Sequence, residues 1–438
     1  MMNELMMEVK TGNELRKAEK YHEALEKYFE NENWDKNIWD VAGVVNCYRK
    51  LKDLKGAKQI LNDYIRKNGE DFLYKDDTIE GKWLKKEFLN VYTNYYLREE
   101  YLKNDKQLID KNALNAIKAA KKIVEFDCGS YNLSQIKRCL FTDEVIAKFP
   151  AELNELIEKI DYNESRYKAD LFAASSNNKK YVDSFYISYI KTKMNLLYNV
   201  GEYEKALDTY DSIDKKLITI ELERAKATVL VAMDRNEEAI ELLEQSIIKF
   251  GKKFYVYAEI ADIYNKIGDC DNALKYYYTA CDNVNKLDFA YKILIKIANL
   301  LLETDKEKAR KHLNLHMLIA KEHEKDHWSL KKDAIELEEK LADYRNLDLD
   351  DKKTLEKEMR TMWKDEAKLN KVRYTGRVSR IFDKGFGFIA FDENNREVFF
   401  RNKNGEFEKG DKVSFVVEKS YDRKKEEFSE IADDIKKY

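Results

Sequence analysis

The chain has 438 residues, enough for two or three domains, and 37% of them are charged. Its net charge of −3 excludes the strongly basic character of a general polyanion binder. The only proline, Pro150, leaves room for long helices, because proline breaks helix interiors. The five cysteines are dispersed, which argues against a disulfide framework. No stretch approaches the length of an apolar membrane span, so we expect a cytoplasmic protein.

A short motif recurs along the chain in two groups, and neighbouring copies within a group lie 33 to 36 residues apart. Each copy has an alanine with a large apolar residue four positions later, and five copies have another nine positions earlier. The alanines are Ala24, Ala57, Ala206, Ala239, Ala273 and Ala309. The later residues are Tyr28, Leu61, Tyr210, Leu243, Tyr277 and Leu313, and the earlier ones are Tyr48, Leu197, Leu230, Tyr264 and Leu300.

The spacing has a packing cause in a pair of helices. A small residue early in the second helix lets the first helix approach closely, and the large residue one turn later fills the groove between them. The pattern resembles the tetratricopeptide repeat, although the usual proline at the end of the second helix is missing. The resemblance implies an α-solenoid, over residues 1–345, whose groove binds an unidentified protein or peptide.

Residues 70–180 are less regular, and we predict either enlarged helical hairpins that continue the solenoid or a separate helical insertion. Within them, residues 112–126 and 151–162 show the periodicity of amphipathic helices, and residues 129–132 are predicted to form a turn. After the last copy of the motif, residues 329–344 and 350–369 are predicted to be charged helices. Residues 346–370 would form a charged helical connector.

Four of the five histidines, His312, His316, His323 and His327, would share one helix face if the helix is continuous. The segment 323–327 has the pattern His-Glu-x-x-His, which can place two zinc ligands beside a glutamate general base. A metal-dependent hydrolase built on His323, Glu324 and His327 is therefore an alternative. Because the surroundings are polar, we interpret the histidines as a solvated stripe and expect no metal. No phosphate-binding glycine loop or activated nucleophile is recognisable, so we predict no enzyme and no cofactor.

Near the end of the chain, the run Lys384-Gly385-Phe386-Gly387-Phe388-Ile389 is typical of a strand with rings on one face. Side chains alternate faces in a strand, so Phe386 and Phe388 share one face while Gly387 and Ile389 share the other. In the following segment 398–401, Phe399 and Arg401 would extend the ring-bearing face. Val398 and Phe400 would point into a small barrel. Exposed rings of this kind suit stacking with unpaired bases.

These residues and the segments around them resemble the cold-shock domain, a five-stranded OB-fold barrel, over residues 371–438. The resemblance implies that Phe386, Phe388 and Phe399 stack on bases. It also implies that Arg380, Lys384 and Arg401 meet phosphates or stack edgewise. The stacking tryptophan of the family's first strand is missing, and we expect Arg380 or Phe382 to replace it in part. The loop over residues 402–407 is short, which predicts a small footprint.

The sequence therefore predicts a mainly α protein, a tetratricopeptide-like solenoid followed by a small five-stranded β-barrel. The predicted function is that of a non-enzymatic adaptor that binds single-stranded RNA or DNA, with RNA favoured by the family resemblance, together with a protein or peptide. RNA-linked regulation and mobile-element defence are both compatible with it. The alternatives are a pure protein-interaction scaffold or a peptide-sensing regulator, in which the barrel docks a protein.

Overall fold

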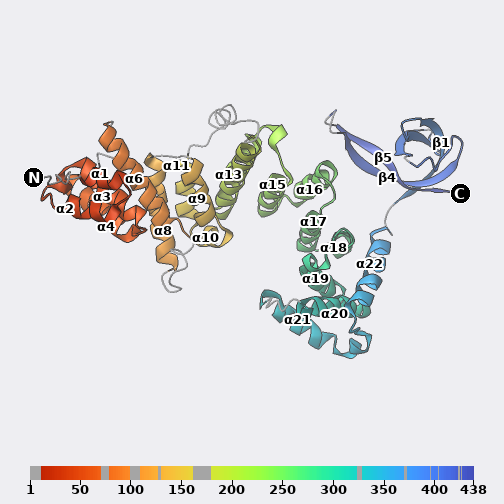
Figure 1. Ribbon diagram of the computed structural model, residues 1–438. Coiled ribbons are helices and arrows are strands. Elements are labelled where there is room, and N and C mark those ends of the chain that lie inside the picture. Colours follow the sequence, from red (N-terminus) through yellow and green to blue (C-terminus); the bar gives the residue numbers. More distant parts are fainter. Residues whose placement is uncertain are drawn as a thin grey trace, which may run out of the picture. The chain divides into compact units, whose positions relative to one another are not determined.

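The computed structural model describes residues 11–70, 78–98, 109–126, 130–160, 179–322, 328–368, 372–394, 396–402, 404–422, 425 and 427–438. The chain divides into two compact units, Met1–Ile213 and Asp214–Tyr438. Helices form the first unit and most of the second, and the strands lie at the end of the second (Figure 1). No helix among the described residues is both long and apolar enough to cross a membrane.

The described residues of the first unit form helices. Their bounds are α1 Gly12–Lys17, α2 Tyr21–Phe29, η1 Trp34–Lys36, α3 Ile38–Lys50, α4 Leu54–Asn68, α6 Ile79–Tyr96, α8 Ile109–Phe126, α9 Ser130–Leu140, α10 Asp143–Lys148, α11 Pro150–Lys159, α13 Lys179–Asn199 and α14 Tyr203–Asp211.

The second unit begins with helices and ends with strands. The helices are η2 Lys215–Leu217, α15 Ile220–Ala232, α16 Asn236–Phe250, α17 Phe254–Lys266, α18 Cys270–Asp282, η3 Leu287–Phe289, α19 Tyr291–Leu301, α20 Lys306–Glu322, α21 Trp328–Lys340, η4 Ala342–Leu347 and α22 Lys352–Lys368. The strands are β1 Arg373–Phe382, β2 Phe386–Phe391, β3 Glu397–Arg401, β4 Lys412–Asp422 and β5 Glu427–Lys437.

The repeated motif corresponds to helix pairs that pack against each other, as in tetratricopeptide-like repeats. The pairs are α1/α2, α3/α4, α13/α14, α15/α16, α17/α18 and α19/α20. In every pair, the motif alanine is the fourth residue of the second helix and its exposed fraction is 0%. The large residue four positions later is also buried in all six pairs. The packing predicted from the motif is therefore confirmed.

The turn inside five of the six pairs has one backbone conformation. The residue five positions before the alanine has a positive φ, and these residues are Glu19, Lys52, Gly201, Asp234 and Gly268. The next residue donates its backbone N–H to the carbonyl of the residue nine before the alanine, at 2.9 to 3.0 Å. This is the Schellman ending of a helix. The α19/α20 pair differs, because there the Asp305 N–H bonds to the Leu301 carbonyl.

Two helices predicted in the irregular middle part are present among its described residues, but one predicted turn is wrong. The helices expected over residues 112–126 and 151–162 correspond to α8 and α11. The turn expected at 129–132 fails from Ser130 onward, because Ser130 begins helix α9. Its Asn132 side chain is buried and accepts a hydrogen bond from the Thr93 hydroxyl of α6 at 3.0 Å. The polar residues Ser130 and Asn132 suggested a turn, but the structure has a helix there that contacts α6.

Helix α22 packs against α18 and α20 despite its charged sequence. Leu355, Met359 and Trp363 follow one another at intervals of four residues, and each is 0% exposed. Four-residue spacing places these three side chains along one stripe of the helix. The helix therefore has a narrow apolar face that docks on the repeats and a charged remainder that faces water.

Two of the four clustered histidines are buried, so the predicted solvated stripe is wrong for them. His312 is 0% exposed and His316 is 4% exposed. The His312 Nε2 accepts a hydrogen bond from the indole N–H of Trp363 at 3.0 Å, and its Nδ1 lies 2.7 Å from the Lys308 carbonyl. These partners fix the neutral ring with its proton on Nδ1. Burial lowers the pKa of His312 to about 4.

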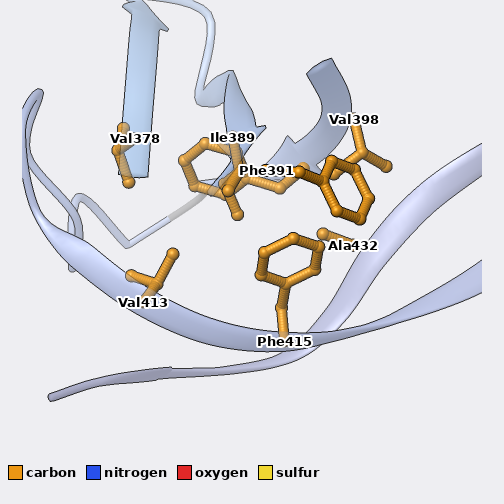
Figure 2. Close-up of a cluster of buried hydrophobic side chains, with 8 residues drawn as sticks. Val378, Ile389, Phe391, Val398, Val413, Phe415 and Ala432 are labelled. Atoms are coloured by element: carbon orange, nitrogen blue, oxygen red, sulfur yellow. The ribbon is translucent and has the colours of Figure 1, made fainter. Parts of the chain in front are cut away.

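The five strands form a closed barrel in the order β1-β2-β3-β5-β4. Neighbouring strands are antiparallel except β3 and β5, which are parallel. The barrel core consists of eight inward-facing side chains that point toward one another (Figure 2). They are Val378, Ile389, Phe391, Val398, Phe400, Val413, Phe415 and Ala432.

Glycine at position 387 is a requirement of this core. A Cβ at Gly387 would lie 2.6 Å from the Phe400 ring and 2.4 Å from the Arg380 carbonyl oxygen. The Phe400 ring therefore occupies the space that a side chain on the inner face of β2 would need. This close approach lets the Phe400 ring fit beneath the strand that carries Phe386 and Phe388.

The shared turn leads to a prediction on stability. Gly268→Ala should lower the free energy of unfolding by about 1 kcal/mol, because a residue with a Cβ is strained at positive φ. An added Cβ there meets no atom within 4 Å, so packing does not contribute to the loss. Urea unfolding followed by circular dichroism measures the change. Asp234→Gly, at the equivalent turn, is the control and should not reduce stability. A Gly268→Ala variant as stable as wild type would contradict the interpretation.

The buried histidine leads to a prediction on pH. The pKa of His312 falls from 6.5 to about 4 on folding, so between these pH values the unfolded chain binds a proton that the folded chain does not. The free energy of unfolding should therefore fall as the pH drops from 6.5 toward 4, by up to about 3 kcal/mol from this group.

The measurement is urea unfolding at several pH values for wild type and His312→Gln. Glutamine keeps an oxygen that can accept the Trp363 hydrogen bond but does not titrate. The variant should lose stability less steeply with falling pH, whatever its stability at neutral pH. His22→Gln, at an exposed position of α2, is the control. Equal slopes for wild type and His312→Gln would show that His312 does not carry the effect.

Candidate nucleic-acid interface

The two faces of β2 and β3 have opposite character. On the inner face, Ile389 is 0% exposed and Phe400 is 0% exposed. On the outer face, Phe386, Phe388 and Phe399 are each half-buried. This alternation follows from the two-residue period of a strand once the core side chains are fixed inside. The three rings lie on the outside, as the sequence pattern predicts.

A fourth ring, Phe382 at the end of β1, joins these three and is 40% exposed. It stacks on Phe386 with ring centroids 4.8 Å apart and meets Phe388 edge-on at 6.2 Å. Phe399 lies 5.6 Å from Phe386 and 6.0 Å from Phe388. We call Phe382, Phe386, Phe388 and Phe399 the aromatic cluster.

The turn between β1 and β2 brings Phe382 and Phe386 together. Gly385 in this turn has a φ of +76°, a conformation that favours glycine. Phe382 and Phe386 are then opposite each other in the register of the two strands. Phe382 was missing from the predicted site residues. The signal that pointed to it was the absent tryptophan of the first strand, which left Arg380 and Phe382 as replacements.

The three predicted basic residues are exposed at the margins of the aromatic cluster. Lys384 lies in the turn between β1 and β2. Arg401 is opposite Phe386 in the register of β2 and β3. The Arg380 guanidinium lies over the Phe388 ring, 4.8 Å from its centroid. Arg380 is therefore the basic residue in direct contact with a ring of the cluster.

Glu397 at the start of β3 brings a negative charge to the same place, which the sequence interpretation missed. Its carboxylate forms an ion pair with Arg380 and accepts a hydrogen bond from the Ser379 hydroxyl at 2.7 Å. The hydrogen bond from Ser379 and the nearby Arg380 lower the pKa of Glu397. The carboxylate therefore stays ionised at neutral pH.

The short loop after β3 is closed by Asn402, which is 6% exposed. Its side-chain amide donates to the Phe407 carbonyl at 2.9 Å, and its oxygen accepts from the Phe407 N–H at 3.2 Å. These two bonds make a compact loop rather than a long one that could reach over a ligand.

Metal ligands are not gathered in the part of the chain that the structure describes. No group of three or more His, Cys, Asp or Glu residues within it is placed to hold a metal ion. The His-Glu-x-x-His segment at 323–327 lies outside the described residues. The alternative based on His323, Glu324 and His327 therefore stays a hypothesis.

Comparisons with known proteins concern the helices. A family model described as a domain of unknown function, DUF7017, matches residues 222–358, and no curated protein matches the chain. The crystal structure of yeast Tom70 is 12% identical, with 82% of this chain and 83% of that chain covered and a TM-score of 0.28.

Two further solved structures are similar at the same level. The anaphase-promoting complex hetero-tetramer Cut9–Hcn1 is 12% identical, with 82% of this chain and 85% of that chain covered and a TM-score of 0.29. The human IFIT1 dimer with PPP-AAAA is 13% identical, with 83% and 91% covered and a TM-score of 0.26. Values this low establish no common function, and the family match ends before the barrel begins.

Proposed function

We propose that the chain is a non-enzymatic adaptor. Its barrel would bind single-stranded nucleic acid on the aromatic cluster, and its helical repeats would bind a protein or peptide. The observation that carries the proposal is the set of four phenylalanine rings gathered on the outer face of the barrel, with Arg380, Lys384 and Arg401 around them.

The rings of the aromatic cluster are not needed to complete the barrel core. Eight other side chains fill that core, among them Phe391, Phe400 and Phe415. Folding therefore does not explain why these rings lie partly in water on the outer face. Base stacking on such rings contributes about 1–3 kcal/mol per base and tolerates any sequence, because every base has a flat π-face.

The charges favour stacking over electrostatic attraction as the main source of affinity. Residues 371–438 contain 16 basic and 14 acidic side chains, so the barrel has little excess positive charge. Few phosphates can then be neutralised, and affinity should fall only gently with salt. A single strand suits this small excess of positive charge better than a duplex does, because the bases of a duplex are already stacked on one another.

The barrel is best interpreted as a cold-shock-like OB-fold. The strand order β1-β2-β3-β5-β4, with the parallel pair β3/β5, supports this assignment. So does the position of the rings on β2 and β3, the strands that bind oligonucleotides in OB-folds. RNA is favoured over DNA by analogy with the family that the segment resembles.

The helical part would supply the second binding activity. Repeated helix pairs build extended surfaces that bind proteins or peptides, which supports a partner for residues 1–345. Residues 346–370 would link the two functions, and residues 371–438 would be the nucleic-acid module. The competing function is a scaffold or peptide-sensing regulator whose barrel docks a protein through the same rings.

The aromatic cluster leads to a prediction on binding. The double variant Phe386→Ala/Phe388→Ala should bind a fluorescein-labelled oligouridylate of about 8 nucleotides at least about tenfold more weakly than wild type, because two stacking platforms are lost. Fluorescence anisotropy at low salt, with the full chain, measures the affinity. Circular dichroism and thermal unfolding verify that the variant is folded.

Phe289→Ala is the matched control, because Phe289 is 62% exposed and lies outside the barrel on η3. This variant should bind the oligonucleotide like wild type. If wild type gives no signal, or if the double variant binds as well as wild type, the nucleic-acid function is refuted. The scaffold function would then gain support if the double variant lost a protein partner instead.

A further inference from the structure

A β-bulge in β1 places Arg380 beside the aromatic cluster. Val378 is opposite Ile389 in the register of β1 and β2, and Arg380 is opposite Phe388, so Ser379 is an additional residue. A bulge of this kind re-aims the side chains that follow it. Without it, alternation would turn Arg380 toward the barrel interior. With it, both Ser379 and Arg380 reach the outer face beside Phe388.

The guanidinium of Arg380 lies over one face of the Phe388 ring. It lies 4.8 Å from the Phe388 centroid, a distance typical of cation–π contact. A planar group stacked on a ring occupies the position of a stacked base. A nucleotide can therefore use this face of Phe388 only after the guanidinium moves.

Glu397 holds the guanidinium there. Its carboxylate forms the ion pair with Arg380 and is itself fixed by the Ser379 hydroxyl. Both side chains retain water contact, since the exposed fractions are 54% for Arg380 and 32% for Glu397. An ion pair this exposed is weak, so a ligand can break the contact.

We propose that Arg380 and Glu397 form a removable cover on Phe388 that sets the affinity of the aromatic cluster for single-stranded nucleic acid. This inference rests on the proposed function. A base displaces the guanidinium from the ring, and the guanidinium leaves Glu397 to contact a phosphate. Glu397 acts through Arg380 and is thus a negative determinant of affinity, because it stabilises the ligand-free arrangement.

A second ion pair in the same barrel allows a matched control. Arg396 forms an ion pair with Glu430, and its guanidinium lies 5.0 Å from the Phe391 centroid. The two arginine–glutamate pairs thus have the same chemistry. The difference is the ring, because Phe391 is 5% exposed and belongs to the core. Replacing Glu430 changes the net charge by the same amount as replacing Glu397. It exposes no ring on which a base could stack.

The experiment compares Glu397→Gln with Glu430→Gln in the full chain, using the same labelled oligouridylate and fluorescence anisotropy. Glu397→Gln should bind about three- to tenfold more tightly than Glu430→Gln, because the ion pair and the cover no longer oppose binding. Its affinity should also fall more steeply with salt, by about 0.7 in the logarithmic slope, since one more cation is available to a phosphate. Equal affinities of the two variants would overturn the cover.

A double-mutant cycle tests whether Glu397 acts through Arg380. In the Arg380→Ala background, Glu397→Gln should change affinity no more than Glu430→Gln does. If the gain persists without Arg380, Glu397 merely repels phosphate and the cover is refuted. Ser379→Ala, which loosens Glu397 and keeps both charges, should give a smaller gain. Failure of wild type to bind at all would refute the proposed function, whereas binding without a Glu397 effect would refute this inference alone.

Discussion

Both the helical part and the barrel depend on positions where a small side chain lets a neighbouring helix or ring pack closely. In the helical part, the fourth residue of each second helix is an alanine that is fully buried, and the first helix packs onto it. In the barrel, Gly387 leaves room for the Phe400 ring beneath β2. A larger side chain at either kind of position would separate the backbones, and the apolar residues around it would lose their contacts.

The same constraint separates folding from function in the barrel. Because Phe400 fits under Gly387, the interior is filled without help from the outer face of β2. The side chains of Phe386 and Phe388 can then serve contacts on the outer face, because the core does not need them. As a result, these rings lie partly in water. At Phe388, the Arg380 guanidinium reduces this exposure by covering one ring face.

The sequence was most informative where the cause of a structural feature is local. Period-two alternation was sufficient to place Phe386, Phe388 and Phe399 outside and Val398 and Phe400 inside, as the structure has them. The spacing of the motif alanines predicted the helix pairs for the same reason. The stacking of Phe382 on Phe386 and the ion pair of Glu397 with Arg380 could not be predicted, because they depend on a tight turn and on pairing between strands.

Features that depend on distant parts of the chain escaped the sequence interpretation. His312 lies among charged residues in the sequence, which suggested a solvated position. It is buried because α22, which follows about fifty residues later in the chain, brings Trp363 onto its ring. The helix that begins at Ser130 is a similar case, since contact with Thr93 of α6 accompanies a segment whose composition indicated a turn. The partner residue in neither contact can be read from local periodicity.

The recurrent Schellman turn has a consequence for how such a chain can change in length. Five pairs connect their helices through the same backbone geometry, with glycine, glutamate, lysine or aspartate at the positive-φ position. Gain or loss of a whole pair would leave the turns of the neighbouring pairs unchanged, and the spacing of 33 to 36 residues between motif alanines shows that pairs of slightly different length are tolerated. The α19/α20 pair, which has its own connection and the docked helix α22, is the exception to this geometry.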